Sequence, residues 1–341
     1  MRAPLVISSA LIGCLAGCAN FQDPDIVIDL RVLSIVAQPA DQVIDISTTS
    51  TQADVLAQLV PTTVCALTAD PAENRQLRWK MTMCNLGDDD RCSDGSDGSD
   101  NSPQIPIGEG VMADPDTTSP EPQMCATIYP NQDLFDVLVN YVANDDLMGL
   151  GGIDYGMLLE VGGVNDSPAD DQFAAKTLQV MPRIPSNVTV NHNPTISGLT
   201  AAVDGGSAAE ISLIRCADLE AFGRTPQLQV TTDDVVRFTP LEPPGVHEVY
   251  VVPTINGGSQ TFTEAISYQW NATQGSFSSG STGGPVDLFG NPAPLFTDWT
   301  TPAPSDINNQ VTNVPLWLVQ RDDRLGEAWF ESCIQVTPVS D

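Results

Sequence analysis

Short runs of alternating apolar and polar residues, rich in valine and isoleucine, recur along the whole chain and are separated by glycine, proline, asparagine or aspartate. The run IVIDLRVLSIVAQPA over residues 26–40 is typical of them. This pattern favours strands with one buried face joined by turns, and therefore a mainly β protein. With 341 residues the chain is long enough to fold as two domains, each with its own core. We therefore expect two β-sandwich domains in tandem.

Changes in composition indicate where these domains begin and end. We expect the first sandwich over residues 28–183, a proline-bearing linker over 184–195 and the second sandwich over 196–341. Within the first, residues 85–124 are rich in glycine, serine, proline and aspartate, which predicts a disordered acidic loop. After this loop, Leu134, Val137, Leu138 and Tyr141 recur at helical spacing behind Asn131, so we expect one short helix with Asn131 as its N-cap.

The first seventeen residues have the features of a secretory signal peptide. Arg2 supplies a positive charge, and the apolar stretch over residues 5–13 is too short to span a bilayer. The sequence Leu-Ala-Gly-Cys that ends at Cys18 resembles the lipobox of bacterial lipoproteins. Leu-Ile-Gly-Cys, ending at Cys14, has the same form, but cleavage before Cys18 leaves a fuller apolar region and a polar mature start. The alternative is an ordinary signal peptide that contains cysteine.

The lipobox resemblance implies where in the cell the protein is located. In that family the cysteine receives a diacylglyceryl group, the signal is cut before it, and the new amine is acylated; here this cysteine is Cys18, and residues 18–27 would form the lipid anchor and tether. Ala19 follows where lipoproteins retained at the inner membrane carry aspartate, so the resemblance implies the outer membrane of a Gram-negative envelope. The side of that membrane stays open.

Cysteine counting supports three disulfides. Once Cys14 and Cys18 are set aside, an even number remains in an exported chain: Cys65, Cys84, Cys92, Cys125, Cys216 and Cys333. The last two are the only pair in the second domain. The other four allow three connectivities, of which we favour Cys84–Cys92 and Cys65–Cys125. Zinc is disfavoured, because no Cys-x2-Cys pair occurs and the two histidines are far apart in sequence.

Two further resemblances concern the sandwich modules. The spacing of Cys65 and Trp79 is similar to that of the strand B cysteine and strand C tryptophan of immunoglobulin domains. The turn at residues 321–326 resembles the Asp-x-Arg-Gly-Gly turn of PKD-like and other bacterial Ig-like domains, with Leu325 in place of the first glycine.

The whole chain also resembles acidic lipoproteins of the myxobacterial type. This resemblance is carried by the lipobox, the Arg-Val-Leu-Ser-Ile run, the Trp79-x4-Cys84 pattern, the His192-Asn193-Pro194 connector and the strands around Trp270 and Trp317. It implies two Ig-like or PKD-like modules held at a membrane.

The charge of the chain limits its partners and ligands. Lysine and arginine number 13 against 44 acidic residues, a formal charge of -31, which disfavours nucleic acid and anionic lipid headgroups. Asp94, Asp97 and Asp100 could offer oxygens to Ca²⁺, but they recur every third residue and lack the alternate spacing of an EF-hand loop. A solvated linker with diffuse cation affinity is favoured, and no cofactor is expected.

Functional motifs favour binding over catalysis. Gly-x-Ser-x-Gly is absent, and a serine triad would need His192 or His247. His247 begins an apparent strand, where we expect a surface or edge histidine, and no catalytic residue is assigned. Trp299, in the proline-rich stretch FTDWTTPAP, is the candidate for stacking on a sugar, whereas Trp79, Trp270 and Trp317 are expected in cores. We predict a non-catalytic binding or structural module for an envelope protein or glycan. The alternatives are an envelope hydrolase or its accessory subunit, and a Ca²⁺-dependent adhesin.

Overall fold

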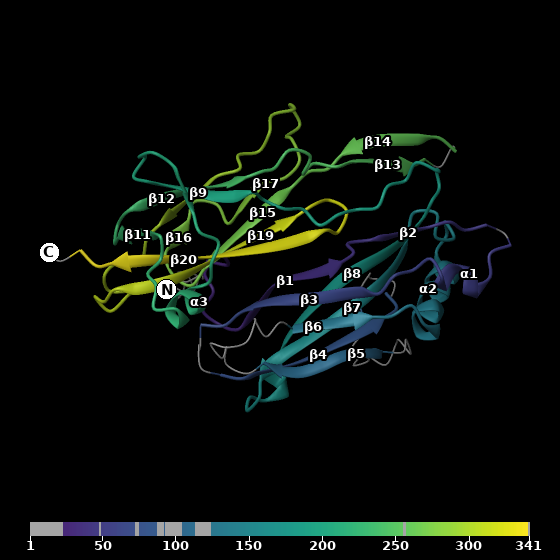
Figure 1. Ribbon diagram of the computed structural model, residues 1–341, viewed down its shortest axis with the longest axis horizontal. Helices are drawn as coiled ribbons and strands as arrows, with labels where there is room; N and C mark the ends of the chain where they lie inside the picture. The colour runs from purple at the N-terminus through teal and green to yellow at the C-terminus, as the bar shows by residue number, and fades with distance from the viewer. Residues whose placement is uncertain are drawn as a thin grey trace, which may run out of the picture.

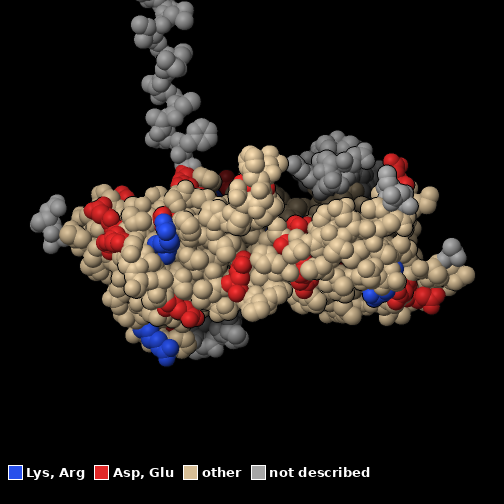
Figure 2. All heavy atoms as spheres, turned by 90° about the horizontal axis from the view of Figure 1, so that it is seen from above, with Lys and Arg blue, Asp and Glu red and all other residues tan. Residues whose placement is uncertain are grey.

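The computed structural model describes residues 23–47, 49–71, 75–86, 92, 104–112, 124–254 and 257–339. It is mainly β and contains two β-sandwiches in tandem, which lie side by side in Figure 1. Among the described residues, no α-helix is both long and apolar enough to span a bilayer. On the face shown in Figure 2, acidic side chains are scattered singly or in small groups, and lysines and arginines are few.

The first sandwich packs a three-stranded sheet against a five-stranded one. The smaller sheet has the order β1 (Arg31–Gln38), β3 (Thr62–Ala69), β6 (Met124–Ile128). The larger sheet has the order β2 (Gln42–Ile44), β8 (Gln172–Pro182), β7 (Ile153–Gly163), β4 (Leu77–Cys84), β5 (Ile105–Met112). A short helix α1 (Gln52–Leu56), a longer helix α2 (Gln132–Asn144) and a 3-10 turn (Pro168–Asp170) connect strands. Alternate residues of the strands, such as Met81, Met157 and Leu159, form its core.

Helix α2 confirms the helix predicted behind Asn131. The Asn131 side chain accepts a hydrogen bond from the backbone N–H of Leu134 at 3.0 Å, which caps the helix as expected. Leu134, Val137 and Leu138 are buried in the core of the first sandwich.

Part of the expected acidic loop is a strand. Residues 105–112 form β5, which pairs with β4 as an edge strand, so the prediction of a continuous loop over 85–124 is wrong for this segment. The indole of Trp79 lies over Gly108 and Gly110, and a Cβ atom at Gly110 would come within 3.1 Å of the indole nitrogen. Trp79 is only partly buried and packs against the edge of the first core. Asp94, Asp97 and Asp100 lie outside the described residues.

The second sandwich consists of two five-stranded sheets and a separate hairpin. One sheet has the order β10 (Ala209–Ile211), β9 (Gly198–Val203), β12 (Val235–Leu241), β18 (Thr297–Thr300), β16 (Ser276–Phe277). The other has the order β11 (Leu228–Thr231), β20 (Glu327–Thr337), β19 (Thr312–Arg321), β15 (Ser267–Ala272), β17 (Ser281–Gly283). The hairpin pairs β13 (Val249–Pro253) with β14 (Ser259–Thr263), and α3 (Cys216–Ala221) is a short helix. Fully buried aromatic side chains, including Phe238 and Trp270, fill the core.

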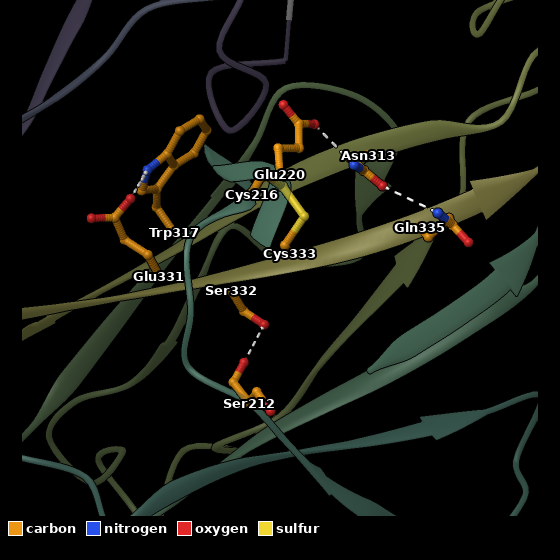
Figure 3. The surroundings of a disulfide bond; sticks show 9 residues. All are labelled: Ser212, Cys216, Glu220, Asn313, Trp317, Glu331, Ser332, Cys333 and Gln335. Carbon is orange, nitrogen blue, oxygen red and sulfur yellow. Dashed lines mark hydrogen bonds between the residues drawn. A yellow bond between two sulfur atoms is a disulfide. The ribbon is translucent and has the colours of Figure 1, made fainter. Parts of the chain in front are cut away.

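Three disulfides join the six cysteines in the pairings that the sequence favoured. Cys65–Cys125 connects β3 to β6, Cys84–Cys92 is local, and Cys216–Cys333 attaches α3 to β20 (Figure 3). Their Cα atoms are 4.1 to 5.7 Å apart.

An apolar cluster joins the two sandwiches. Leu33 and Leu67 of the first sandwich pack with Trp317 and Val319 of β19, and Trp329 lies against them. The Trp317 indole therefore lies at the junction and not inside one domain core, and its Nε1 donates to Glu331 Oε2 at 3.1 Å (Figure 3).

A buried lysine extends this junction. The Nζ of Lys176, on β8, lies 2.6 Å from the Leu325 carbonyl and 3.0 Å from Glu327 Oε1. Glu327 also accepts a hydrogen bond from Ser34 of β1 at 2.7 Å, so its carboxylate links the sandwiches.

The expected tether differs from the observed chain path. Residues 23–27 lie on the second sandwich, where the Val27 N–H donates to the Ala272 carbonyl at 2.8 Å and the Ala272 N–H donates to the Asp25 carbonyl at 3.1 Å. Val27 is fully buried, so the chain crosses from the second sandwich into β1 of the first. Any free tether after Cys18 ends before residue 23; Cys18 itself lies outside the described residues. Between the sandwiches, the strands end at residue 182 and resume at 198, on either side of the predicted linker.

Candidate functional site

Trp299 does not form the sugar-stacking surface that the sequence suggested. It lies on β18 with no exposed surface, and its Nε1 donates to the Gln274 carbonyl at 3.1 Å. Its ring is tilted by 39° against Phe238, with the centroids 6.2 Å apart. The side chain lies in the core because β18 is held between β12 and β16, although the flanking threonines and prolines suggest a loop. No sugar can reach this indole in the folded protein.

The structure brings the two histidines, which are far apart in sequence, into one polar cluster at the junction. His192 Nδ1 lies 2.7 Å from Glu248 Oε1, and His247 Nδ1 lies 3.0 Å from the Glu264 carbonyl. Arg324 connects them, with Nη2 at 2.7 Å from Glu248 and Nε at 2.5 Å from Glu264. Within the described ranges, no group of three or more histidine, cysteine or acidic side chains is placed to hold a metal ion.

Burial of carboxylates around this cluster alters their acidity. Asp41, which is 6% exposed and accepts the Asn191 N–H at 2.8 Å, has its pKa raised to about 6, mainly because burial disfavours the charged form. Burial likewise raises the pKa of Glu264 and that of Asp322. Arg324 lies near all three carboxyl groups and acts in the opposite direction. It offsets part of the rise in each pKa, and all three pKa values remain raised.

Arg324 makes this cluster a connection between several segments of the chain. Arg324, in the turn before β20, contacts the segment before the hairpin through Glu248 and the linker through the Thr189 carbonyl at 3.3 Å. Its guanidinium also lies 4.7 Å from the centre of the Tyr250 ring on β13. These contacts hold the hairpin, the linker and the β19–β20 turn together.

Two shallow depressions carry polar side chains. One, of about 470 Å³, is lined by Pro24, Asp25 and Arg321 among others, but Arg321 donates to Gln269 Oε1 at 2.7 Å and to the Leu33 carbonyl at 2.9 Å. The other, of about 350 Å³, lies over β4, β5 and β7 and is lined by charges of both signs, including Lys80 and Glu160.

Exposed apolar side chains gather in a loop of the first sandwich. This loop, residues 145–150 after α2, is called the Asp145 loop. Leu147 is 52% exposed, Met148 75% and Leu150 46%. The Asp145 carboxylate accepts the backbone N–H of Leu147 at 3.2 Å and that of Gly149 at 2.6 Å. These hydrogen bonds hold the backbone that carries the three apolar side chains.

The second sandwich has a loop built in the same manner. This loop, residues 285–291 after β17, is called the Asp287 loop. The Asp287 carboxylate accepts the backbone N–H groups of Phe289 and Asn291, each at 2.8 Å. Leu288 is 102% exposed and Phe289 90%. The side-chain amide of Asn291 also donates to this carboxylate, at 2.8 Å. That hydrogen bond, followed by those from the backbone N–H groups, lowers the pKa of Asp287, so the carboxylate stays charged and the loop keeps its shape at neutral pH.

Neither loop follows from a recognised sequence motif. Each has an aspartate whose carboxylate accepts the N–H groups two and four residues later, two consecutive apolar residues, and then a glycine with positive φ, Gly149 or Gly290. The pattern that could have indicated these loops is an aspartate followed closely by Leu-Met-Gly or Leu-Phe-Gly outside a strand. Turns of this kind usually carry polar residues, so paired large apolar residues in them indicate a contact surface.

Comparison with known proteins assigns no family. No protein-family model matches the chain, and no curated protein matches it. Solved structures that it resembles include the native alpha-2-macroglobulin of Escherichia coli, at 9% identity and a TM-score of 0.23 over 91% of this chain and 17% of that one.

Two other similar structures are equally distant. Dimeric latent PorU of Porphyromonas gingivalis is 10% identical, with a TM-score of 0.20 over 92% of this chain and 24% of that one. A β-glucuronidase of Parabacteroides merdae is 7% identical, with a TM-score of 0.17 over 87% of this chain and 24% of that one. The chain thus spans a quarter or less of the length of each of these proteins.

Proposed function

We propose that this protein is a lipid-anchored, non-catalytic binding module of the outer membrane of a Gram-negative envelope, and that its first sandwich binds an envelope protein through the Asp145 loop. The observation that carries the proposal is the group of exposed Leu147, Met148 and Leu150 on a backbone fixed by Asp145. Three large apolar side chains within four residues exceed the scattered apolar exposure that is normal for a protein surface.

The chemistry of the loop favours a protein partner over a glycan. Glycans stack on exposed aromatic rings, whereas this loop displays two leucines and a methionine. Methionine adapts its shape to a partner and is enriched in protein interfaces. Because Asp145 fixes the backbone before a partner arrives, little conformational entropy is lost on binding.

Other features support an anchored protein outside the cytosol. Three disulfides suit an oxidising compartment. The lipobox-like sequence ending at Cys18 supports anchoring at that residue. The apolar cluster around Trp317 and the buried Lys176–Glu327 pair support a stable relative placement of the two sandwiches, as a module that presents a surface away from its anchor requires.

The binding site is tested with Met148→Asn. Met148 has φ +53°, a conformation in which asparagine is better tolerated than methionine, so the variant should fold at least as stably as the native chain while it loses apolar surface. We expect its affinity for the envelope partner to fall about tenfold or more, the loss typical of an important interface residue. The matched control is Phe222→Asn, which removes a 66% exposed apolar side chain elsewhere.

The measurement is capture from envelope extract on the immobilised Cys18→Ser chain, followed by titration of the purified captured protein. A partner retained by the native loop and by Phe222→Asn but released by Met148→Asn supports the proposal. The proposal is contradicted if the native chain, Phe222→Asn and Met148→Asn bind every captured protein with equal affinity. Anchoring is tested separately: Cys18→Ser, with Cys14 intact, should abolish uptake of labelled lipid.

A further inference from the structure

The Asp287 loop combines very high apolar exposure with an almost complete lack of charge. Leu288 and Phe289 have nearly all of their surface in solvent. Between Ser281 and Phe296, Asp287 is the only charged residue, and its carboxylate is turned inward to accept backbone hydrogen bonds. In a chain with a formal charge of -31, such a neutral apolar tip is distinctive. The Asp145 loop differs, because Asp146 adds a second acidic residue to it.

The Asp287 loop lies on the sandwich through which the chain enters the fold. Asp25 lies directly against Gly280, where a Cβ atom would overlap the Asp25 carboxylate. Gly280 immediately precedes β17, and β17 leads into the loop. Twenty-two residues precede the described structure, and the five steps from Cys18 to residue 23 can span at most about 18 Å. A lipid carried by Cys18 would therefore hold this sandwich close to the bilayer.

We infer that the Asp287 loop inserts Leu288 and Phe289 into the phospholipid surface that holds the acylated Cys18. This inference rests on the proposed lipid anchor. The loop has one charged group, the Asp287 carboxylate, which is held by hydrogen bonds within the loop. Its leucine and phenylalanine are residues that partition into the boundary between headgroups and acyl chains. Such a second contact would stop the protein from rotating about its anchor.

The test uses a fluorescent reporter in the acylated full chain. Phe289→Trp places an indole at the loop tip, and Phe222→Trp places one on the exposed end of α3 as the matched control. The native chain, whose five tryptophans include the partly buried Trp79 and Trp329, supplies the background emission that is subtracted. Each protein is reconstituted into phosphatidylcholine vesicles with or without bromine atoms on the acyl chains, which quench nearby indoles, and binding is measured by flotation.

The expected result is that every acylated chain floats with the vesicles and that only the Phe289→Trp reporter shifts to shorter wavelength and loses at least about half of its emission in brominated lipid. Flotation without quenching at position 289 overturns the inference and leaves the anchor intact. Absence of flotation of the native chain overturns the anchor and the inference together. Protection of the 289 reporter from acrylamide by envelope protein, without quenching by lipid, assigns the loop to a protein partner and also overturns the inference.

Discussion

At the scale of single residues, Trp299 is held by contacts on several sides. Its ring packs against Phe238, its Nε1 donates to the Gln274 carbonyl, and Gly275 follows with a φ of +86°. A Cβ atom at Gly275 would lie 2.4 Å from the Trp299 nitrogen, so the turn before β16 needs glycine both for its backbone conformation and for the close approach of the indole. The side chain is therefore part of the core of the second sandwich.

Trp299→Ala should destabilise the protein strongly. Removing a fully buried tryptophan loses apolar burial and leaves a cavity, which typically costs about 3–5 kcal/mol of the free energy of unfolding. Urea unfolding followed by circular dichroism measures this difference. The control is Phe222→Ala, whose side chain is mostly exposed and whose loss should have little effect. An alanine variant of Trp299 with native stability would contradict the assignment to the core.

At the scale of elements, disulfides join segments at very different separations in the sequence. The Cys216–Cys333 bridge attaches the short helix α3 to β20 and closes a separation of 117 residues, whereas Cys84–Cys92 closes one of 8. In the chain-entropy description, a cross-link stabilises by restricting the unfolded chain, and the effect grows with the loop that it closes. The longer bridge should therefore stabilise more.

Replacing each cysteine pair by alanine tests this order. The Cys216→Ala/Cys333→Ala variant should lose about 4–5 kcal/mol of the free energy of unfolding and the Cys84→Ala/Cys92→Ala variant about 2–3 kcal/mol. Chemical denaturation of both variants beside the native chain gives the two differences. Equal losses, or a larger loss for the short bridge, would show that contacts in the folded protein outweigh the entropy of the unfolded chain.

Elements whose structure depends on a local sequence pattern were predicted correctly. Elements whose structure depends on contacts with residues distant in the sequence were missed. Helix α2 and its cap at Asn131 follow from spacing within one segment. Strand β5 does not, because IPIGEGVM contains a proline and two glycines, and the indole of Trp79 supplies the packing that those glycines lack. Among candidate sites, the exposure of Met148 and Phe289 depends on which neighbouring segments leave them uncovered, and no local pattern shows that.

At the scale of the whole molecule, the junction between the sandwiches contains buried charge. Lys176 pairs with Glu327 across it, and Asp41 of the first sandwich accepts the N–H of Asn191 in the linker. Paired groups such as Lys176 and Glu327 compensate each other, whereas Asp41 makes no ion pair within 4.0 Å among the described residues. Ionised Asp41 therefore destabilises the folded junction between the sandwiches, and protonation of Asp41 stabilises it.

The resulting dependence of stability on pH has a definite sign. The pKa of Asp41 rises from 3.8 to about 6 on folding, so the folded protein holds this proton more tightly than the unfolded chain. The stabilisation from that proton is fully present below about pH 4 and is lost as the pH rises through about 6. Asp41→Asn keeps an acceptor oxygen for the Asn191 N–H and removes the titration.

The variant should consequently gain stability relative to the native chain as the pH rises from about 4 to 7, by about 1–3 kcal/mol. Thermal and urea unfolding of both proteins across this range gives the difference, and Asp233→Asn, at an exposed turn position with φ +72°, is the control. A difference between Asp41→Asn and the native chain that stays constant with pH would mean that Asp41 titrates alike in the folded and unfolded chain. The junction would then carry no pH dependence through this residue.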